Sequence, residues 1–302
     1  MIKFLITIIG PTAIGKTSLS IEIAKHFNTE IISADSRQFF KEMAIGTAVP
    51  SKEELTEVKH HFTQNISIHE NYSVGQFEKD AIAKLNSLFI NNNILVMVGG
   101  SGLYVDAVLK GLDDFPEVDK QIREGLKLKL ENEGLIALQE QFKKLDTETY
   151  HKIDIENHQR VIRALEICIG TGNPFSSFIT DKTAQRNFTP IKIGLSADRK
   201  IIYDRINQRV DNMLTDGLLD EAKKLHQFKE LNALQTVGYK ELFEYFDANF
   251  ELDFAISEIK KNTRRFAKRQ LTWYRKDSDI QWFDFQENNK NIIQYIKEII
   301  NQ

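Results

Sequence analysis

The fold is decided by residues 4–17, which read FLITIIGPTAIGKT. Phe4–Ile9 is a short apolar run, and this pattern predicts a buried strand of a parallel sheet. Gly10–Thr17 follows at once and matches G-x-x-x-x-G-K-[ST], a loop whose backbone amides surround phosphate oxygens. Gly15–Phe27 then shows helical periodicity, so the loop stands between a strand and a helix. This is the context in which the motif binds phosphate.

The loop offers three kinds of phosphate contact. Its glycines let backbone N–H groups converge, and the start of the following helix adds partial positive charge. Lys16 adds a full charge, and the Thr17 hydroxyl is a ligand for Mg²⁺. The alternative, a turn whose glycines only redirect the chain, is disfavoured because every signature position is present. We therefore expect a diphosphate or triphosphate to bind at Gly10, Pro11, Thr12, Ala13, Ile14, Gly15, Lys16 and Thr17.

Further apolar runs predict more strands, with helical segments between them. The predicted strands are Glu30–Ala34, Ile94–Val98, Ile191–Leu195 and, near the end, Trp282–Phe285, followed by a closing helix at Ile292–Ile300. Strands that alternate with helices are typical of an α/β fold. We expect a P-loop NTPase-like core in which helices flank a parallel sheet.

The stretch from about Phe115 to Lys182 has few strand signals and long helix-like patterns. These patterns cover Ile122–Glu133, Gly134–Leu145 and His158–Ile169. Because the stretch lies between the third and fourth predicted strands, we expect a smaller all-helical insertion domain at 115–187. The catalytic core would then comprise 1–114 and 188–302, with a second helical region at Lys200–Gln270.

The composition limits the partners, the metal sites and the cellular compartment that we expect. The 302 residues contain no apolar run of the ~18 residues that a transmembrane helix needs, so we expect no membrane partner. Cys168 is the only cysteine, which excludes an internal disulfide and a cysteine-based zinc site and fits a reducing cytoplasm. The formal net charge of −3 argues weakly against nucleic-acid binding, although local clustering of charge matters more than the sum.

The phosphate loop alone does not choose between reactions. In P-loop nucleotide hydrolases, an acidic residue at the end of another strand holds Mg²⁺. Here Ile94–Val98 ends in Gly99-Gly100-Ser101, without a carboxylate, and the carboxylate closest to a strand end is Asp35. This counts against ordinary ATP hydrolysis. A small-molecule or nucleotide kinase that uses ATP is the main alternative, and a non-catalytic P-loop protein that binds RNA is another.

Several segments in a fixed order make the chain resemble a known family, the bacterial tRNA dimethylallyltransferases (tRNA isopentenyltransferases). The segments are Gly10–Thr17, Ser33–Gln38, Ile45–Ala48, His60-His61, Gly99–Tyr104, Arg160–Glu166, Val237–Glu241 and Thr263–Trp273. The resemblance covers nearly the whole chain, and the joint order and spacing are highly specific. The chain departs from the family pattern at Phe40, Ala44, Val49 and Ser101. The family usually has Thr at the last of these positions, so a hydroxyl is kept there.

The resemblance implies transfer of a dimethylallyl group from dimethylallyl diphosphate to N6 of adenine 37, in the anticodon loop of tRNA. The ligand of the phosphate loop would then be the diphosphate of the donor, with Mg²⁺, although the motif alone suggests ATP. Arg209 would hold the same diphosphate. Asp35 would act as the general base, and Ser101 would touch the nucleotide or the diphosphate. The residues alone leave simpler roles open: a solvated charge for Arg209, and local caps for Asp35 and Ser101.

The resemblance also implies the contacts with tRNA. It places them at Asp35, Ser36, Arg37, Gln38, Ser101, Arg123, Gln159, Arg160, Val161, Ile162 and Arg163. Lys260–Lys276 adds a basic stretch that has no acidic residue and includes Trp273 and Tyr274. On a helix, Arg265 and Arg269 lie one turn apart and suit phosphate contact, although a solvated basic helix is the alternative. The target base must leave its stack to react. We assign no chemistry to His60 and His61, and we expect a monomer.

Overall fold

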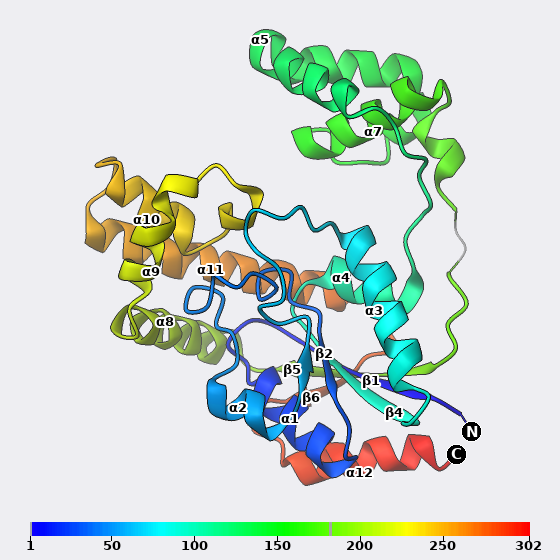
Figure 1. Ribbon diagram of the computed structural model, residues 1–302, viewed down its shortest axis with the longest axis vertical. Helices are drawn as coiled ribbons and strands as arrows, with labels where there is room; N and C mark the ends of the chain where they lie inside the picture. Colours follow the sequence, from blue (N-terminus) through cyan, green and yellow to red (C-terminus); the bar gives the residue numbers. More distant parts are fainter. Residues whose placement is uncertain (1, 181–182) are drawn as a thin grey trace. The chain divides into compact units, whose positions relative to one another are not determined.

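The chain forms two compact units (Figure 1). This computed structural model describes residues 2–180 and 183–302. The larger unit comprises Met1–Lys110 and Gln185–Gln302, and the smaller unit is Gly111–Ala184. The insertion expected from the sequence, 115–187, starts and ends a few residues later than the smaller unit, and residues 181 and 182 within it lie outside the described part.

The larger unit is built on a six-stranded parallel sheet of order β3-β2-β4-β1-β5-β6. The strands are β1 (Phe4–Ile9), β2 (Ile31–Ser33), β3 (His60–His61), β4 (Ile94–Val98), β5 (Thr189–Ser196) and β6 (Gln281–Asp284). The predicted α/β fold with a parallel sheet is confirmed. The sequence does not predict β3, because two residues are too few to show a period.

Helices cover both faces of this sheet (Figure 1). They are α1 (Lys16–His26), α2 (Lys52–Glu57), α3 (Val74–Leu88), α4 (Gly102–Lys110), α8 (Arg199–Thr215), α9 (Leu218–Leu225), α10 (Tyr239–Phe246), α11 (Leu252–Tyr274) and α12 (Asn289–Ile300). Alternate residues of β1 enter different cores. Leu5 and Ile9 pack in the core that includes α3 and α4, whereas Ile6 and Ile8 pack in the core that includes α1 and α12. No element was predicted between residues 36 and 93, so α2 and α3 are known only from the structure.

The strand ends position the site. Because β1, β2 and β4 run parallel, their carboxyl ends meet at one edge of the sheet. The phosphate loop follows β1, Asp35 follows β2, and Gly99-Gly100-Ser101 follows β4. Three segments far apart in sequence are therefore brought together. Within the described residues, no helix has both the length and the apolarity that a membrane crossing requires.

The smaller unit has its own helical core. Its α-helices are α5 (Lys120–Leu145), α6 (Thr147–Tyr150) and α7 (His158–Thr171), and its buried core includes Leu138, Phe142 and Leu165. The backbone of α5 leaves the helical conformation at Gly134, with φ 80° and ψ 176°. The prediction of two helices that meet at Glu133 and Gly134 is therefore confirmed.

Gly134 and Gly125 offer a matched pair of substitutions in α5. Gly134→Ala should destabilise the smaller unit by about 1–3 kcal/mol, because an L-residue rarely adopts this backbone conformation. Gly125→Ala lies in regular helix with open space around the added methyl, and should stabilise by about 0.5–1 kcal/mol. Denaturant unfolding followed by circular dichroism measures both. Equal stability of the two variants would contradict the break at Gly134.

Candidate active site

A cavity of about 660 Å³ opens at the carboxyl edge of the sheet in the larger unit. Its walls come from the phosphate loop, the segment after β2, a loop around residue 48, the turn after β4, and one face each of α8 and α11. The lining residues that carry the argument are Lys16, Thr17, Asp35, Ser101, Arg209 and Gln270. Most residues that the sequence predicted for the chemistry thus share one cavity.

Lys16 lies inside the phosphate loop. Its Nζ donates a hydrogen bond to the Pro11 carbonyl at 2.8 Å, which folds the side chain back over the loop. Burial lowers the pKa of Lys16 to about 7; the Asp35 carboxylate opposes this shift and the Arg209 guanidinium adds to it. An anion with several negative oxygens would restore the full charge of Lys16. The loop is therefore electrostatically prepared for a phosphate group.

Arg209 reaches the same loop from α8. Its Nη1 donates to Thr12 Oγ1 at 3.3 Å, and burial lowers its pKa against the attraction of Asp35. The partly buried guanidinium contacts the phosphate loop, which disfavours the solvated charge considered as the alternative for this residue. Arg205, one turn earlier, donates from Nε to the Ala13 carbonyl at 2.7 Å. Arg205 was not predicted as a site residue, although its spacing of four from Arg209 places both on one helical face.

Asp35 uses one of its two carboxylate oxygens for local structure. Oδ1 accepts a hydrogen bond from the Arg37 amide at 3.1 Å, which is the local cap considered as its alternative role. Among the described residues, none donates a hydrogen bond to Oδ2. Asp35 therefore combines the two roles: one oxygen shapes the turn, and the other is left as an acceptor in the cavity.

Ser101 joins the turn after β4 to the turn after β2. Its Oγ accepts a hydrogen bond from the Ser36 amide at 3.2 Å and lies 3.1 Å from Ser36 Oγ. The Ser101 carbonyl accepts the amides of Tyr104 and Val105, so its backbone precedes the first turn of α4 while its hydroxyl bonds to Ser36. Ser36 was predicted only as a tRNA contact, and the structure shows that it bonds to Ser101.

Gln270 is a site residue to which the sequence analysis gave no role. It is buried on α11, where Oε1 accepts the Thr12 amide at 2.8 Å and Nε2 donates to the Gly100 carbonyl at 2.8 Å. One side chain thus fixes the phosphate loop against the turn after β4. A Cβ at Gly100 would lie 2.3 Å from Gln270 Nε2, which explains the glycine.

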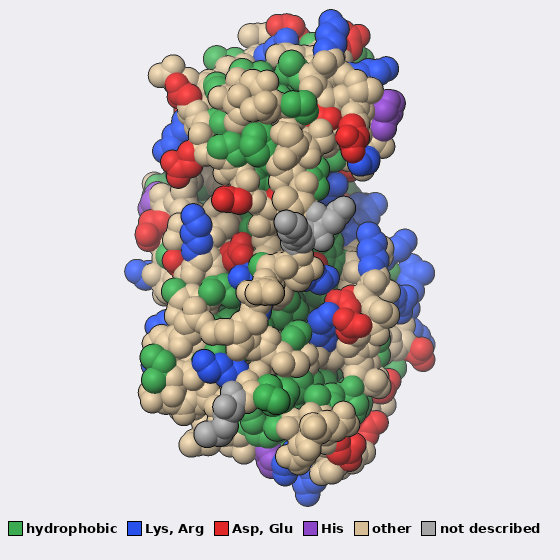
Figure 2. Space-filling model, turned by 90° about the vertical axis from the view of Figure 1, so that its right-hand side faces the viewer, with side chains coloured by type: hydrophobic (Ala, Val, Ile, Leu, Met, Phe, Trp, Pro, Cys, Tyr) green, Lys and Arg blue, Asp and Glu red, His purple; other side chains and the backbone are tan. Residues whose placement is uncertain are grey.

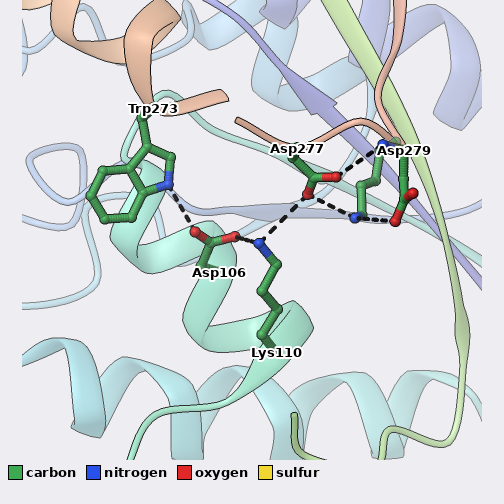
Figure 3. Close-up of polar contacts among 6 residues, drawn as sticks. Asp106, Lys110, Trp273, Asp277 and Asp279 are labelled. Atoms are coloured by element: carbon green, nitrogen blue, oxygen red, sulfur yellow. Dashed lines mark hydrogen bonds and ion pairs between the residues drawn. The ribbon is translucent and has the colours of Figure 1, made fainter. Parts of the chain in front are cut away.

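The end of α11 is fixed to α4 and β5 by a polar network (Figure 3). Trp273 Nε1 donates to Asp106 at 2.8 Å, and Lys110 pairs with Asp106 at 3.0 Å and with Asp277 at 3.5 Å. Asp277 also pairs with Lys192 of β5 at 2.8 Å. The network holds the helix from which Gln270 reaches the phosphate loop.

In the basic stretch of α11, some side chains are paired with carboxylates and others are exposed to solvent. Lys260 pairs with Asp211 at 2.6 Å, whereas Arg265 and Arg269 are exposed. Arg269 lies over the ring of Phe266, 5.7 Å from its centre, and Phe266 lines the cavity. Acidic and basic side chains are intermingled over the face shown in Figure 2, in keeping with the small net charge.

Tyr274 is not available to RNA. Its side chain is buried in the core with α3 and α4, so the prediction that it belongs to a basic, aromatic RNA surface is wrong. Arg37 and Gln38, predicted as tRNA contacts, already bond within the protein. Arg37 Nη1 donates to the Asn232 carbonyl at 2.9 Å, and Gln38 Nε2 donates to the Ala48 carbonyl at 2.9 Å.

The residues of the smaller unit that were predicted to contact tRNA differ in their exposure to solvent. Gln159 and Arg160 are exposed on the first turn of α7. Arg123 and Arg163 both pair with Glu166, at 2.9 Å and 3.4 Å. The side chains of Val161 and Ile162 lie in the core of the unit. The helix turns these two side chains inward, and the predicted contact of residues 161 and 162 with tRNA stays a prediction.

His60 and His61 lie at one edge of the sheet, and His60 also lines the cavity. They form β3, the edge strand beside β2. His61 Nε2 lies 2.5 Å from Glu30 Oε2, and His60 Nδ1 donates to the Val58 carbonyl at 2.8 Å. In the described part of the chain, no three His, Cys, Asp or Glu side chains gather as metal ligands.

Comparisons with known proteins agree with the predicted resemblance. The family described as IPP transferase matches residues 38–277. A tRNA dimethylallyltransferase of Christiangramia forsetii is 64% identical over 301 residues, which cover 100% of both chains. One of Flavobacterium johnsoniae is 60% identical, with 98% of each chain covered.

Solved structures give the same result. A tRNA isopentenylpyrophosphate transferase from Bacillus halodurans matches with a TM-score of 0.72 and 38% identity, covering 99% of this chain and 96% of that one. A eukaryotic dimethylallyltransferase acting on tRNA matches with a TM-score of 0.85 and 25% identity, covering 99% of this chain and 80% of that one. With the family matched over most of its length, this chain belongs to the IPP transferase family, the tRNA dimethylallyltransferases.

Proposed function

We propose that this chain transfers a dimethylallyl group from dimethylallyl diphosphate to N6 of adenine 37 in tRNA. The products are N6-(dimethylallyl)adenosine and diphosphate. One observation carries the proposal. The phosphate loop and Asp35, whose Oδ2 is left as an acceptor, line the same cavity, while β4 ends without a carboxylate. This arrangement suits displacement of a diphosphate by a nucleophile better than hydrolysis of ATP.

The reaction makes three demands on the site. The bond between C1 of the donor and its diphosphate oxygen breaks while N6 bonds to C1, and a proton leaves N6. Negative charge that builds on the leaving group meets the loop amides, Lys16 and Arg209. Asp35 accepts the proton through Oδ2. Ser101 lines the same cavity as Asp35 and bonds to its neighbour Ser36, and it offers a hydroxyl to the nucleotide or the diphosphate.

Magnesium fits the donor set of this site. Thr17 offers a hydroxyl at the start of α1, and Mg²⁺ usually takes its other ligands from substrate phosphates and water rather than from a cage of side chains. When bound, Mg²⁺ would neutralise part of the charge on the diphosphate. Thr17 would hold it on the side of the loop that faces the cavity.

The other parts of the proposal concern partners and setting. tRNA would bind through its anticodon loop to Arg265 and Arg269 of α11 and to exposed residues of α7, such as Arg160. The chain would act as a monomer in the cytoplasm. The single cysteine, Cys168, is buried and unpaired, which suits a reducing compartment. No observation favours the kinase alternative.

The proposal is tested by incubating unmodified tRNA with radiolabelled dimethylallyl diphosphate, with and without ATP. We expect label to pass to tRNA at the same rate in both mixtures, because the donor itself occupies the phosphate loop. Transfer that depends on ATP, or no transfer at all, would contradict the proposal.

Asp35→Asn separates the two roles of this residue. The amide oxygen of Asn can still accept the Arg37 amide, so the turn is kept, but the general base is lost. We expect kcat to fall by about 10²–10⁴ and tRNA affinity to stay within a few-fold. Single-turnover kinetics and filter binding measure these quantities, with exposed Asp204→Asn as the control. Lost affinity with intact turnover would show that Asp35 is not the base.

Arg265→Ala combined with Arg269→Ala tests the RNA surface of α11. Two lost phosphate contacts should weaken tRNA binding and reduce the slope of log K against log salt by about 1.4–1.8. Lys260→Ala on the same helix is the control, since Lys260 is already paired with Asp211 and should leave the slope unchanged. An unchanged slope in the double variant would assign these arginines to solvent.

A further inference from the structure

The loop of residues 44–50 forms one wall of the cavity and has no role in the chemistry above. The residues of this loop that line the cavity are Gly46, Thr47, Ala48, Val49 and Pro50. The loop contains Ile45–Ala48, one of the segments that carry the family resemblance. It belongs to no helix or strand, so contacts with the rest of the chain must hold it in place.

Glu221 of α9 holds the first half of this loop. Its Oε2 accepts hydrogen bonds from the amides of Ala44 at 3.0 Å and Ile45 at 2.9 Å, and its Oε1 accepts the amide of Gly46 at 2.9 Å. Three successive amides thus converge on one carboxylate, as in a backbone nest for an anion. Hydrogen bonds to a charged acceptor are stronger than those between neutral groups.

Tyr239 of α10 completes this anchor. Its hydroxyl donates to Glu221 Oε1 at 2.6 Å, and its side chain is fully buried. The ring packs against Gly46 so closely that a Cβ there would lie 2.6 Å from ring atoms. Burial and the Glu221 carboxylate raise the pKa of Tyr239, so the phenol remains a donor. Two segments of the family resemblance, Ile45–Ala48 and Val237–Glu241, therefore meet at Glu221.

The second half of the loop is tied to the segment that carries the general base. Gln38, three residues beyond Asp35, donates from Nε2 to the carbonyls of Thr47 at 3.3 Å and Ala48 at 2.9 Å. Ala48 has a positive φ of 50°, a conformation that costs energy for a residue with a Cβ and persists only where contacts enforce it. The loop is thus held between Glu221 and the Asp35–Gln38 segment.

We propose that Glu221 is a positioning residue for prenyl transfer: with Tyr239 it holds the loop of residues 44–50 against Asp35–Gln38, and this keeps water from the allylic carbon of the donor. The inference rests on the proposed function. Water competes with N6 as the nucleophile. Its oxygen would bond to C1 while the bond from C1 to the diphosphate breaks, a proton would pass to solvent, and prenyl alcohol and diphosphate would form. A weak nucleophile such as N6 prevails only where water is excluded.

Glu221→Gln tests this role with little change in shape. A side-chain NH₂ cannot accept an amide hydrogen, so at least one amide of the loop loses its partner. With labelled dimethylallyl diphosphate and tRNA, the ratio of labelled prenyl alcohol to labelled tRNA should rise about tenfold, the factor that ~1.4 kcal/mol of lost interaction gives. Hydrogen exchange should be faster at the amides of Ala44, Ile45 and Gly46. The control is Asp220→Asn, exposed on the same helix, which should match the wild type in both measurements.

Tyr239→Phe keeps the carboxylate and the ring and removes one hydrogen bond. It should raise the same ratio by a smaller factor, about two- to fivefold, and it carries the test if Glu221→Gln does not fold. Faster exchange in the loop with a wild-type ratio would mean that the anchor is structural only, and unchanged exchange would mean that the loop does not depend on Glu221. Either result overturns the inference. Absence of transfer by the wild type would instead overturn the proposed function.

Discussion

Two partly buried cations, Lys16 and Arg209, face one carboxylate, Asp35, at the edge where the parallel strands end. Burial disfavours the charge on both cations, so an anion that satisfies them gains more than it would in water. The start of α1 adds partial positive charge at the same edge of the sheet. This excess of positive charge is the constraint on which the site depends, because it favours a ligand with several negative oxygens and would stabilise the proposed diphosphate leaving group.

Much of the surrounding structure serves to hold these charges in place. Gln270 fixes the phosphate loop against the turn after β4, and Ser101 fixes that turn against the segment of Asp35. The network of Asp106, Lys110 and Asp277 anchors the helix that carries Gln270. The bonds of Gln270 and Ser101 join residues far apart in sequence, and each of these two side chains connects two of the segments that meet at the edge of the sheet.

The sequence predicted those features of the fold that depend on patterns among neighbouring residues. The strand, loop and helix from Phe4 to Phe27 are continuous in the chain, so their apolar period and their glycines predict them without a structure. The break at Gly134 could be predicted in the same way, because it also depends on a local pattern. Asp35 and Ser101 were located from strand ends, and their roles came from the family resemblance.

What the sequence could not predict depends on distant partners or on short elements. Gln270 and Glu221 act on backbone groups that lie 258 and 177 residues away, at Thr12 and Ala44, and no local signal marks such a bond. β3 has only two residues, and a period needs more. Val161 and Ile162 matched a family segment, but only the packing of α7 shows that they point inward. Resemblance identifies a segment, whereas the fold decides which of its side chains are free.

A crystal structure of the protein with a non-reactive thiolo analogue of dimethylallyl diphosphate is the most direct measurement of the central claim. We expect the diphosphate to lie on the amides of residues 13–17 and to contact Lys16 and Arg209, with the allylic carbon turned toward Asp35. A diphosphate bound elsewhere, or an allylic carbon turned away from Asp35, would contradict it.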